Sequence, residues 1–207
     1  MGGTAEELRY ANKVWAYQNR IDWRLAARVA LRMAELWPGA RVLDFGCGPG
    51  RFSRMLHESG CDVVGADVSE AMLQMALSMT SPGLKFVQLD PKVGLDYDRE
   101  FDFIFCLHVL GHVDDLHDTI EQFRRALRPN GKVLVVNPNL LHTMLRKPID
   151  WMTGYKPDPT IKHRFTCAQL AQIMAHHGFE KEQSCSWGGR FLFAYPLFIA
   201  RFTVSKD

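Results

Sequence analysis

Several features are missing from this sequence, and each absence excludes a class of protein. No run approaches the roughly 18 consecutive apolar residues that a membrane-spanning helix needs. The N-terminus is polar and carries Glu6 and Glu7, unlike a signal peptide. The formal net charge of +2 is far from the strongly basic balance typical of a nucleic-acid-binding chain. The five cysteines are odd in number and contain no C-x-x-C pair, so we expect reduced thiols in a cytoplasmic protein.

What remains is an ordinary globular composition with a strong pattern. The 207 residues suit one domain with a substantial core, and the 47% of hydrophobic residues can fill it. Apolar runs alternate with helical patterns from residue 41 to residue 137, which is typical of a parallel sheet covered on both faces. We therefore expect an α/β fold. Its strands are predicted at 41–45, 62–67, 84–89, 101–108 and 132–137.

Helical patterns and a hairpin account for the rest of the fold. Thr4 and Thr166 each begin a capping box, which marks the start of a helix. Apolar residues recur at helical spacing from Leu116 to Leu127, just before Pro129-Asn-Gly. The segments 180–187 and 191–204 predict a hairpin that completes the sheet. Further helices are expected from 22 to 36, around Phe52 and after Ser69.

The segment 42–50, Val-Leu-Asp-Phe-Gly-Cys-Gly-Pro-Gly, carries most of the functional signal. It lies where the first predicted strand passes into a helix, which is where α/β sheets bind nucleotide-like ligands. Its glycines allow the backbone to turn and to approach a ligand closely. Asp67 ends the next strand about 20 residues after the turn, at the spacing of a carboxylate that accepts hydrogen bonds from ribose hydroxyls.

The glycine spacing separates the possible nucleotides. A dinucleotide fold needs G-x-G-x-x-G, with the pyrophosphate on a helix N-terminus, whereas this turn has G-x-G-x-G. Asp44 lies two residues before the first glycine, where it would repel a pyrophosphate. The same carboxylate suits the ammonium and sulfonium charges of S-adenosylmethionine. No Gly-Lys-Ser/Thr follows, so a P-loop is also excluded.

Several segments in order resemble class I S-adenosylmethionine-dependent methyltransferases, in the style of the ubiquinone and menaquinone biosynthetic branch. They are 44–50, 63–69, 101–104 with 109–114, 127–131 (Leu-Arg-Pro-Asn-Gly), and 165–166 with 177–179. The resemblance implies a Rossmann-like, seven-stranded, mostly parallel sheet with helices on both faces and an antiparallel last strand.

The resemblance also assigns roles to the glycine turn. Asp44, Gly46 and Gly48 would hold the methionine part of S-adenosylmethionine, and Gly50 would shape the turn. Cys47 fits the turn as a small buried residue beside the cofactor, and we do not expect it to be a nucleophile.

The ends of the second and third strands are expected to hold the adenosine. Asp67 would take the ribose hydroxyls, and Val68 would pack on the adenine. Asp90 matches the position whose carboxylate meets the adenine amino group, with Leu89 beside it. Pro91 stands where the family often has a small residue, a departure that bears on the adenine contact.

The end of the fourth strand is expected to border the methionine and the reacting centre, through Cys106, Leu107 and His108. His108 is the candidate catalytic residue, as a general base or acceptor contact, although simple packing would also explain it. Tyr17 is a candidate cofactor contact from the N-terminal segment. His112 and His117 are near His108 in sequence, but their spacing across a strand end and a loop does not predict a metal site.

One methyltransferase domain is predicted over residues 1–207. Within it, we expect an N-terminal helical cover at 1–36 and a cofactor-binding core at 41–137. The long segment 138–162 would be a substrate-side insertion, and 163–207 a C-terminal helix and hairpin.

The leading functional prediction is methyl transfer to an O, C or N atom of a small molecule, mainly by positioning and desolvation. RNA or protein methylation is the alternative, and no nucleic-acid partner is expected. The segment 106–109 reads Cys-Leu-His-Val and lacks the Asn/Asp-Pro-Pro-aromatic motif that resembling families use on base amines. An inactive, cofactor-binding regulatory subunit remains open, whereas the glycine spacing disfavours a nicotinamide dehydrogenase.

Overall fold

The computed structural model describes residues 4–140, 144, 151–152, 158, 160–187 and 197–205. Its helices are α1 (Ala5–Gln18), α2 (Ile21–Ala34), α3 (Arg51–Glu58), α4 (Glu70–Leu77), α5 (Leu116–Ala126) and α7 (Cys167–His176). Its strands are β1 (Arg41–Phe45), β2 (Asp62–Asp67), β3 (Leu84–Gln88), β4 (Phe101–Leu107), β5 (Leu127–Pro138), β6 (Phe179–Trp187) and β7 (Leu197–Val204).

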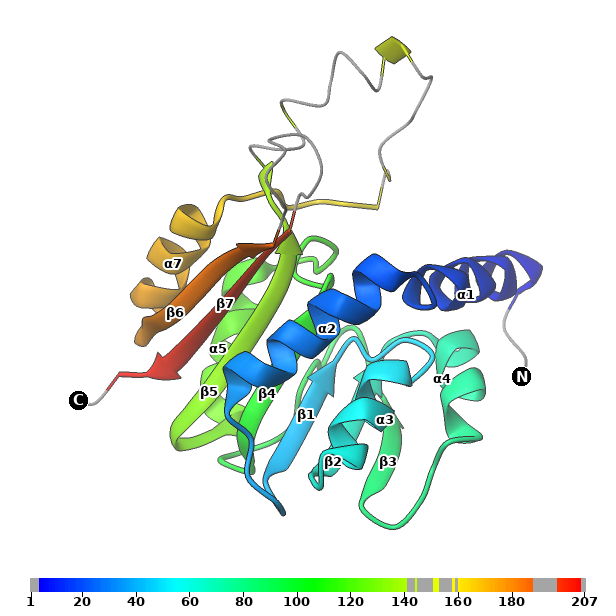
Figure 1. The fold of residues 1–207 in the computed structure, drawn as a ribbon, viewed down its shortest axis with the longest axis horizontal. Coiled ribbons are helices and arrows are strands. Elements are labelled where there is room, and N and C mark those ends of the chain that lie inside the picture. The colour runs from blue at the N-terminus through cyan, green and yellow to red at the C-terminus, as the bar shows by residue number, and fades with distance from the viewer. Residues whose placement is uncertain are drawn as a thin grey trace.

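The strands form one seven-stranded sheet in the order β3-β2-β1-β4-β5-β7-β6 (Figure 1). The first five strands are mutually parallel, and β7 runs antiparallel between β5 and β6. The predicted fold class, including the antiparallel strand that completes the sheet, is therefore confirmed.

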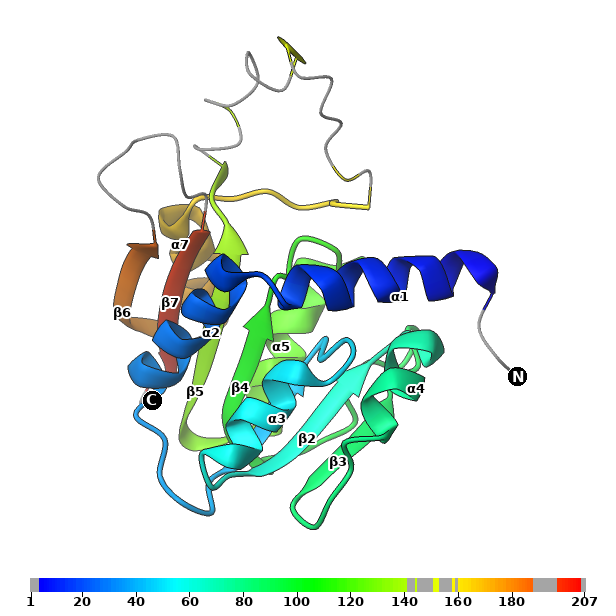
Figure 2. The same ribbon diagram turned by 45° about the vertical axis from the view of Figure 1, so that its right-hand side comes forward.

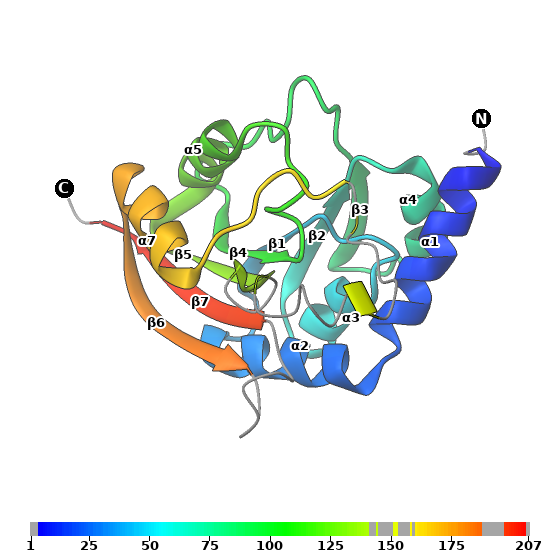
Figure 3. The same ribbon diagram turned by 90° about the horizontal axis from the view of Figure 1, so that it is seen from above.

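Helices cover both faces of the sheet, as the view from above shows (Figure 3). One face packs against α2 and α3, where Trp23 and Phe52 meet Phe105 of the central strand β4. The other face packs against α5 and α7, where Phe123 meets Phe45 edge-on. Because both faces are buried, the central strands are apolar almost throughout, which is why β1 and β2 have the bounds that the sequence predicts.

Three predicted boundaries are wrong. Leu127 does not end a helix: its backbone is extended (φ −83°, ψ 143°), and it begins β5 by pairing with Phe101. The strand β4 ends at Leu107, because the left-handed backbone of His108 (φ 62°) cannot continue a strand. The second helix is Ile21–Ala34 rather than 22–36, because Glu35 adopts a left-handed conformation and stops it.

Other predicted boundaries differ little. Both capping boxes are confirmed, with reciprocal hydrogen bonds between Thr4 and Glu7 and between Thr166 and Gln169. The third strand stops at Gln88, one residue early. The predicted last strand, 191–204, is a strand from Leu197 to Val204, and its first six residues lie outside the described part of the chain.

The carboxyl ends of the parallel strands meet at one edge of the sheet, and α1 crosses near this edge (Figures 1 and 2). Ala11 of α1 packs against Ala71 and Met72 of α4, which fixes α1 beside the loops that follow β1 and β2. No helix among the described residues combines the length and apolar character that crossing a bilayer requires.

Candidate functional site

The glycine turn after β1 is held by the backbone of the neighbouring strand. The N–H groups of Gly46 and Cys47 both donate to the carbonyl of Ala66, at 2.7 and 3.0 Å. Gly46 has a φ of +72°, and a Cβ added there would lie 2.2 Å from a methyl group of Val109. Only glycine therefore fits at this position, where the loops after β1 and β4 touch.

Asp44 projects from the middle of the sheet and is only 2% exposed. The Ser53 hydroxyl of α3 donates to its carboxylate at 2.6 Å. Burial, joined by the nearby charge of Asp67, raises the pKa of Asp44 to about 7, although the Ser53 hydrogen bond lowers it. Burial disfavours the ionised form of this carboxyl group, so a cation bound beside it would stabilise that form.

Asp67 links the glycine turn to the end of β2. Its carboxylate accepts the N–H of Gly48 at 2.8 Å and the N–H of Ser69 at 2.9 Å. Burial raises its pKa, whereas these backbone hydrogen bonds oppose the rise. A carboxylate offers about four acceptor positions. Two backbone donors orient Asp67 and leave it able to accept further hydrogen bonds.

The predicted adenine contacts share an edge with Asp67. The Leu89 N–H donates to the Asp67 carbonyl at 2.9 Å, and the Leu89 side chain is buried. Val68 is 52% exposed, as expected of a side chain that packs on a flat ring only when a ligand is present. Asp90 is exposed, and its carboxylate accepts the Lys92 N–H at 2.8 Å.

At the end of β4, Cys106 is fully buried, and burial raises the pKa of its thiol. His108 follows in a left-handed conformation, and its N–H donates to Val136 of β5 at 2.7 Å. The Tyr17 ring of α1 meets the His108 ring edge-on, with centroids 5.9 Å apart. Two predicted site residues that lie far apart in the sequence, Tyr17 and His108, are thus in contact.

Part of the predicted insertion also reaches this edge. The N–H groups of Lys162 and His163 donate to the carbonyl of Gly111, and His112 bonds the Thr160 hydroxyl at 3.0 Å. Burial raises the pKa of Asp158, but hydrogen bonds from Thr160 and the charges of His112 and Lys13 outweigh it, so the net shift is downward.

Tyr10 of α1 also lies near this edge of the sheet. Burial, followed by the charges of Asp158 and Asp67, raises the pKa of its phenol. Helix α1 and the region of Asp158 and residues 160–163 therefore approach each other near Asp67. Together with the Tyr17 contact, this arrangement puts two separate segments over the carboxyl edge of the sheet.

Two buried amides at this edge had no sequence signal. Gln18 is 8% exposed, and its side-chain oxygen has no hydrogen-bond partner among the described residues. Its amide nitrogen lies 3.6 Å from the position of a Cβ added to Gly48. Asn137, at the end of β5, is 3% exposed, and its side-chain oxygen likewise lacks a partner within the described chain. A buried amide oxygen without a partner is costly, so each of these two atoms is a position at which a ligand or an ordered water would bond.

His112 and His117, which are near each other in the sequence, contact different parts of the structure. His117 lies on α5 and bonds His177 at 2.9 Å, and His177 in turn faces Glu121 at 3.3 Å. His112 instead bonds Thr160. Among the described residues, no group of three or more His, Cys, Asp or Glu side chains could hold a metal ion.

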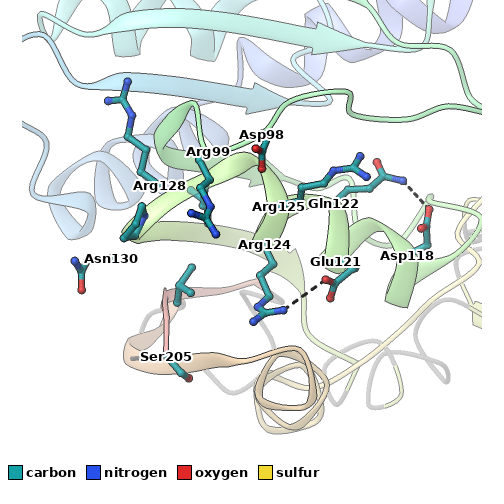
Figure 4. Close-up of a pocket in the computed structure, with 13 residues that line it drawn as sticks. Asp98, Arg99, Asp118, Glu121, Gln122, Arg124, Arg125, Arg128, Asn130 and Ser205 are labelled. Carbon is teal, nitrogen blue, oxygen red and sulfur yellow. Dashed lines mark hydrogen bonds and ion pairs between the residues drawn. The ribbon is translucent and has the colours of Figure 1, made fainter. Parts of the chain in front are cut away.

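A cavity of about 730 Å³ lies at the opposite edge of the sheet, where β5 begins and β7 ends (Figure 4). It is lined by Arg99, Arg124 and Arg128 together with acidic side chains, and Arg124 pairs with Glu121 at 3.6 Å. The size of a cavity therefore does not identify the candidate functional site, because this cavity lies at the other edge of the sheet. The glycine turn and the carboxylates of the buried Asp44 and the half-buried Asp67 do identify it, because their chemistry suits a cationic nucleoside.

The fold and this edge define an α/β protein that binds a nucleoside cofactor beyond its parallel strands. The family comparison is more specific. The model of the methyltransferase domain family matches residues 16–184, and the chain belongs to this family. The predicted class, a class I S-adenosylmethionine-dependent methyltransferase, is thereby confirmed.

Two curated relatives cover part of the chain. A ubiquinone biosynthesis O-methyltransferase of Pseudomonas aeruginosa is 32% identical over 113 residues, which are 49% of this chain and 45% of the relative. A malonyl-acyl-carrier-protein O-methyltransferase of Enterobacter lignolyticus is 36% identical over 92 residues, or 44% of this chain and 36% of the relative. The chain thus spans less than half the length of these relatives.

A solved structure covers the fold almost completely. It is a chain in the complex between the Haloferax volcanii Trm112 methyltransferase activator and a methyltransferase, with a TM-score of 0.80 and 18% identity. The match covers 99% of this chain and 100% of that chain. At this identity the likeness concerns the fold alone.

Proposed function

We propose that the chain transfers the methyl group of S-adenosylmethionine to an O, C or N atom of a small molecule. The observation that carries the proposal is a pair of carboxylates, the buried Asp44 and the half-buried Asp67, on either side of a turn that only glycine can form at Gly46. When bound, the cofactor supplies a methyl group activated by its sulfonium charge.

The residues present fit the amino-acid end of this cofactor. Asp44 presents a buried carboxyl group whose pKa is raised to about 7 by desolvation, and an ammonium or sulfonium beside it would favour its ionised form. Gly46 allows the turn to pack against Val109, Gly48 would allow the methionine chain to approach the backbone, and Gly50 caps the N-terminus of α3. Cys47 lies buried within the turn as a small spacer. Gln18, which the sequence did not indicate, would form a hydrogen bond to the methionine part of the cofactor through its side-chain amide.

The adenosine end fits the neighbouring loops. Asp67 is held by two backbone N–H groups and has acceptor positions left for two ribose hydroxyls. The exposed Val68 and the buried Leu89 would pack on the adenine. Asp90 would accept from the adenine amino group, beside Pro91.

The acceptor side is proposed at the ends of β4 and β5. Cys106, Leu107 and His108 would border the reacting centre, with Tyr17 closing it from α1. His108 is our candidate for an acceptor contact or base. Helix α1, Asp158 and residues 160–163 would exclude water from the transfer, which strengthens the electrostatic contacts inside.

Three observations support a small-molecule acceptor and a cytoplasmic protein. One curated relative is named as an O-methyltransferase of ubiquinone biosynthesis, and the other as a malonyl-acyl-carrier-protein O-methyltransferase. The strand end at 106–109 has no motif for a base amine. The five cysteines are free thiols, in keeping with a reducing compartment.

The proposal is tested by following a labelled methyl group. The protein is incubated with S-adenosylmethionine carrying an isotopic methyl label and, separately, with the small-molecule, RNA and protein fractions of a cell extract. We expect label in the small-molecule fraction with the parent protein and not with Asp67→Ala. Label confined to RNA or protein would overturn the acceptor class, and no transfer to any fraction would contradict the activity.

A further inference from the structure

The outer face of α2 carries a regular row of arginines. Arg20, the N-cap residue, and then Arg24, Arg28 and Arg32 of the helix follow one another at four-residue intervals, and all four are exposed. Four residues of an α-helix rise about 6 Å, so the three helical arginines extend over about 12 Å of one helix surface. The opposite face of α2 is buried against the sheet. The row therefore lies on the outside of the molecule.

Helix stability does not explain this row. In the part of the chain that the structure describes, no carboxylate pairs with Arg24, Arg28 or Arg32. Like charges four residues apart destabilise a helix, and cations in a first turn oppose the helix dipole. The positive surface also continues onto α3: burial, followed by the charge of Arg24, lowers the pKa of Arg51, and the Arg51 guanidinium lies 4.1 Å over the Trp15 ring.

Aliphatic side chains lie beside the arginines on the same outer face. Ile21 is 71% exposed and Leu25 is 39% exposed, one helical turn apart. A helix surface that combines arginines with exposed aliphatic side chains is typical of helices that lie in the interface of a membrane. There the aliphatic groups enter the boundary below the headgroups while the cations meet anionic lipids.

We propose that the outer face of α2 docks this protein on a membrane surface that contains anionic lipid headgroups. A convex helix face offers no cavity for a small anion. A phosphodiester chain would match the arginines but gives Ile21 and Leu25 nothing to bury against. A lipid surface accommodates both kinds of side chain at once.

The position of this surface links it to the candidate site. The N-terminal end of α2 follows α1 near the carboxyl edge of the sheet (Figure 2). Tyr17 of α1 comes shortly before it in the chain, and the Tyr17 ring contacts that of His108. Docking through α2 would bring the open side of that edge close to the lipid surface. The inference itself does not depend on methyl transfer, because it concerns a different face of the molecule.

Vesicle sedimentation tests the proposal with the full chain. Vesicles of phosphatidylcholine alone are compared with vesicles containing about 30% phosphatidylserine, since anionic lipid is what basic helices recognise. Each arginine near such a surface contributes about fivefold in binding, so Arg24→Gln with Arg28→Gln should weaken it about 25-fold. Ile21→Ser should weaken it as well. The matched control is Lys85→Gln with Lys181→Gln, which removes the same charge from exposed positions on β3 and β6 and should change binding less than about twofold.

Three results would overturn the proposal. The first is no sedimentation of the parent protein with the anionic vesicles. The second is an equal loss in the Lys85/Lys181 control, which would mean that net charge alone acts. The third is α2-dependent binding of a mixed-sequence RNA oligonucleotide without vesicle binding, which would assign the surface to nucleic acid. Matching unfolding temperatures would establish that the exposed substitutions leave the fold intact.

Discussion

The two halves of the carboxyl edge of the sheet differ in how they are built. Beyond β1 and β2, backbone hydrogen bonds hold the site in place: a glycine turn bonds to the carbonyl of Ala66, and Asp67 is oriented by two backbone N–H groups. Beyond β4 and β5, side chains from distant segments meet, as in the contact of Tyr17 with His108. The proposed cofactor is the same in all such enzymes, so a fixed backbone arrangement can bind it, whereas different acceptors require different side chains. The part of the site beyond β1 and β2 can therefore be predicted from a sequence, and the part beyond β4 and β5 cannot.

The largest expected effect is in the backbone-built half. In the proposed site, Asp67→Ala would remove two charge-assisted hydrogen bonds to the ribose, each worth about 1.5–3 kcal/mol at most. We expect the affinity for S-adenosylhomocysteine, measured by titration calorimetry, to fall at least tenfold while the far-ultraviolet circular dichroism is unchanged. Normal binding by this variant would show that Asp67 does not hold the ribose.

Asp44→Asn should separate binding from stability. The folded-state pKa of Asp44 is raised from 3.8 to about 7, so ionised Asp44 destabilises the fold above pH 7, and this penalty disappears as the pH falls from 7 towards 4. The variant should be more stable than the parent at pH 8, by at most about 4 kcal/mol, and equally stable near pH 4. Its affinity for S-adenosylhomocysteine should fall about tenfold, because the ammonium loses a charged partner.

Urea unfolding at the two pH values and calorimetry measure both effects. A stability gain that persists at pH 4 would show that desolvation of the Asp44 carboxylate is not its cause. Ser53→Ala is the control for losing the hydrogen bond alone, because it removes the hydroxyl donor and leaves the Asp44 carboxylate in place.

Gln18→Met sharpens the comparison, because Gln18 is a side chain from α1 that lies beside the glycine turn. The side-chain oxygen of Gln18 is buried without a partner in the described chain, so replacing the amide should stabilise the free protein. The same change should weaken S-adenosylhomocysteine about fivefold, the effect of one neutral hydrogen bond. Methylthioadenosine, which lacks the amino-acid end, should bind both proteins equally. Equal losses with the two ligands would place Gln18 away from the methionine part.

The smallest expected effect is at His108. Its left-handed backbone and its contact with Tyr17 give it a packing role, so His108→Asn should leave turnover within about threefold of the parent. A positioned general base typically contributes 10²–10⁴-fold. A loss of that size, with normal cofactor affinity and a missing acidic limb in the pH–rate profile, would make His108 the base instead.

How far the sequence could predict the fold follows the same division. The bounds of β1 and β2 came directly from apolar runs buried on both sides. Leu127 was misassigned because a buried leucine after a helical stripe fits either a last helical turn or a first strand residue. Pairing with Phe101, across the sheet, decides between them. Local periodicity contains no information about that contact.

The site shows the same limit. Asp44 and Asp67 were found because charge and glycine spacing are read along the chain. Gln18 was missed because its role depends on α1 crossing the sheet edge, and a glutamine in a helix has no spacing that marks it. The contact of residues 160–163 with the loop after β4 was expected only as a long insertion without defined partners.

The central claim, that this edge binds S-adenosylmethionine through Asp44 and the glycine turn, is tested most directly by titrating the parent protein with three ligands in a calorimeter. S-adenosylmethionine, S-adenosylhomocysteine and NAD are compared under the same conditions. We predict that the first two bind and that NAD does not, because Asp44 attracts a cation and repels a pyrophosphate. Binding of NAD without binding of either S-adenosyl compound would contradict this account.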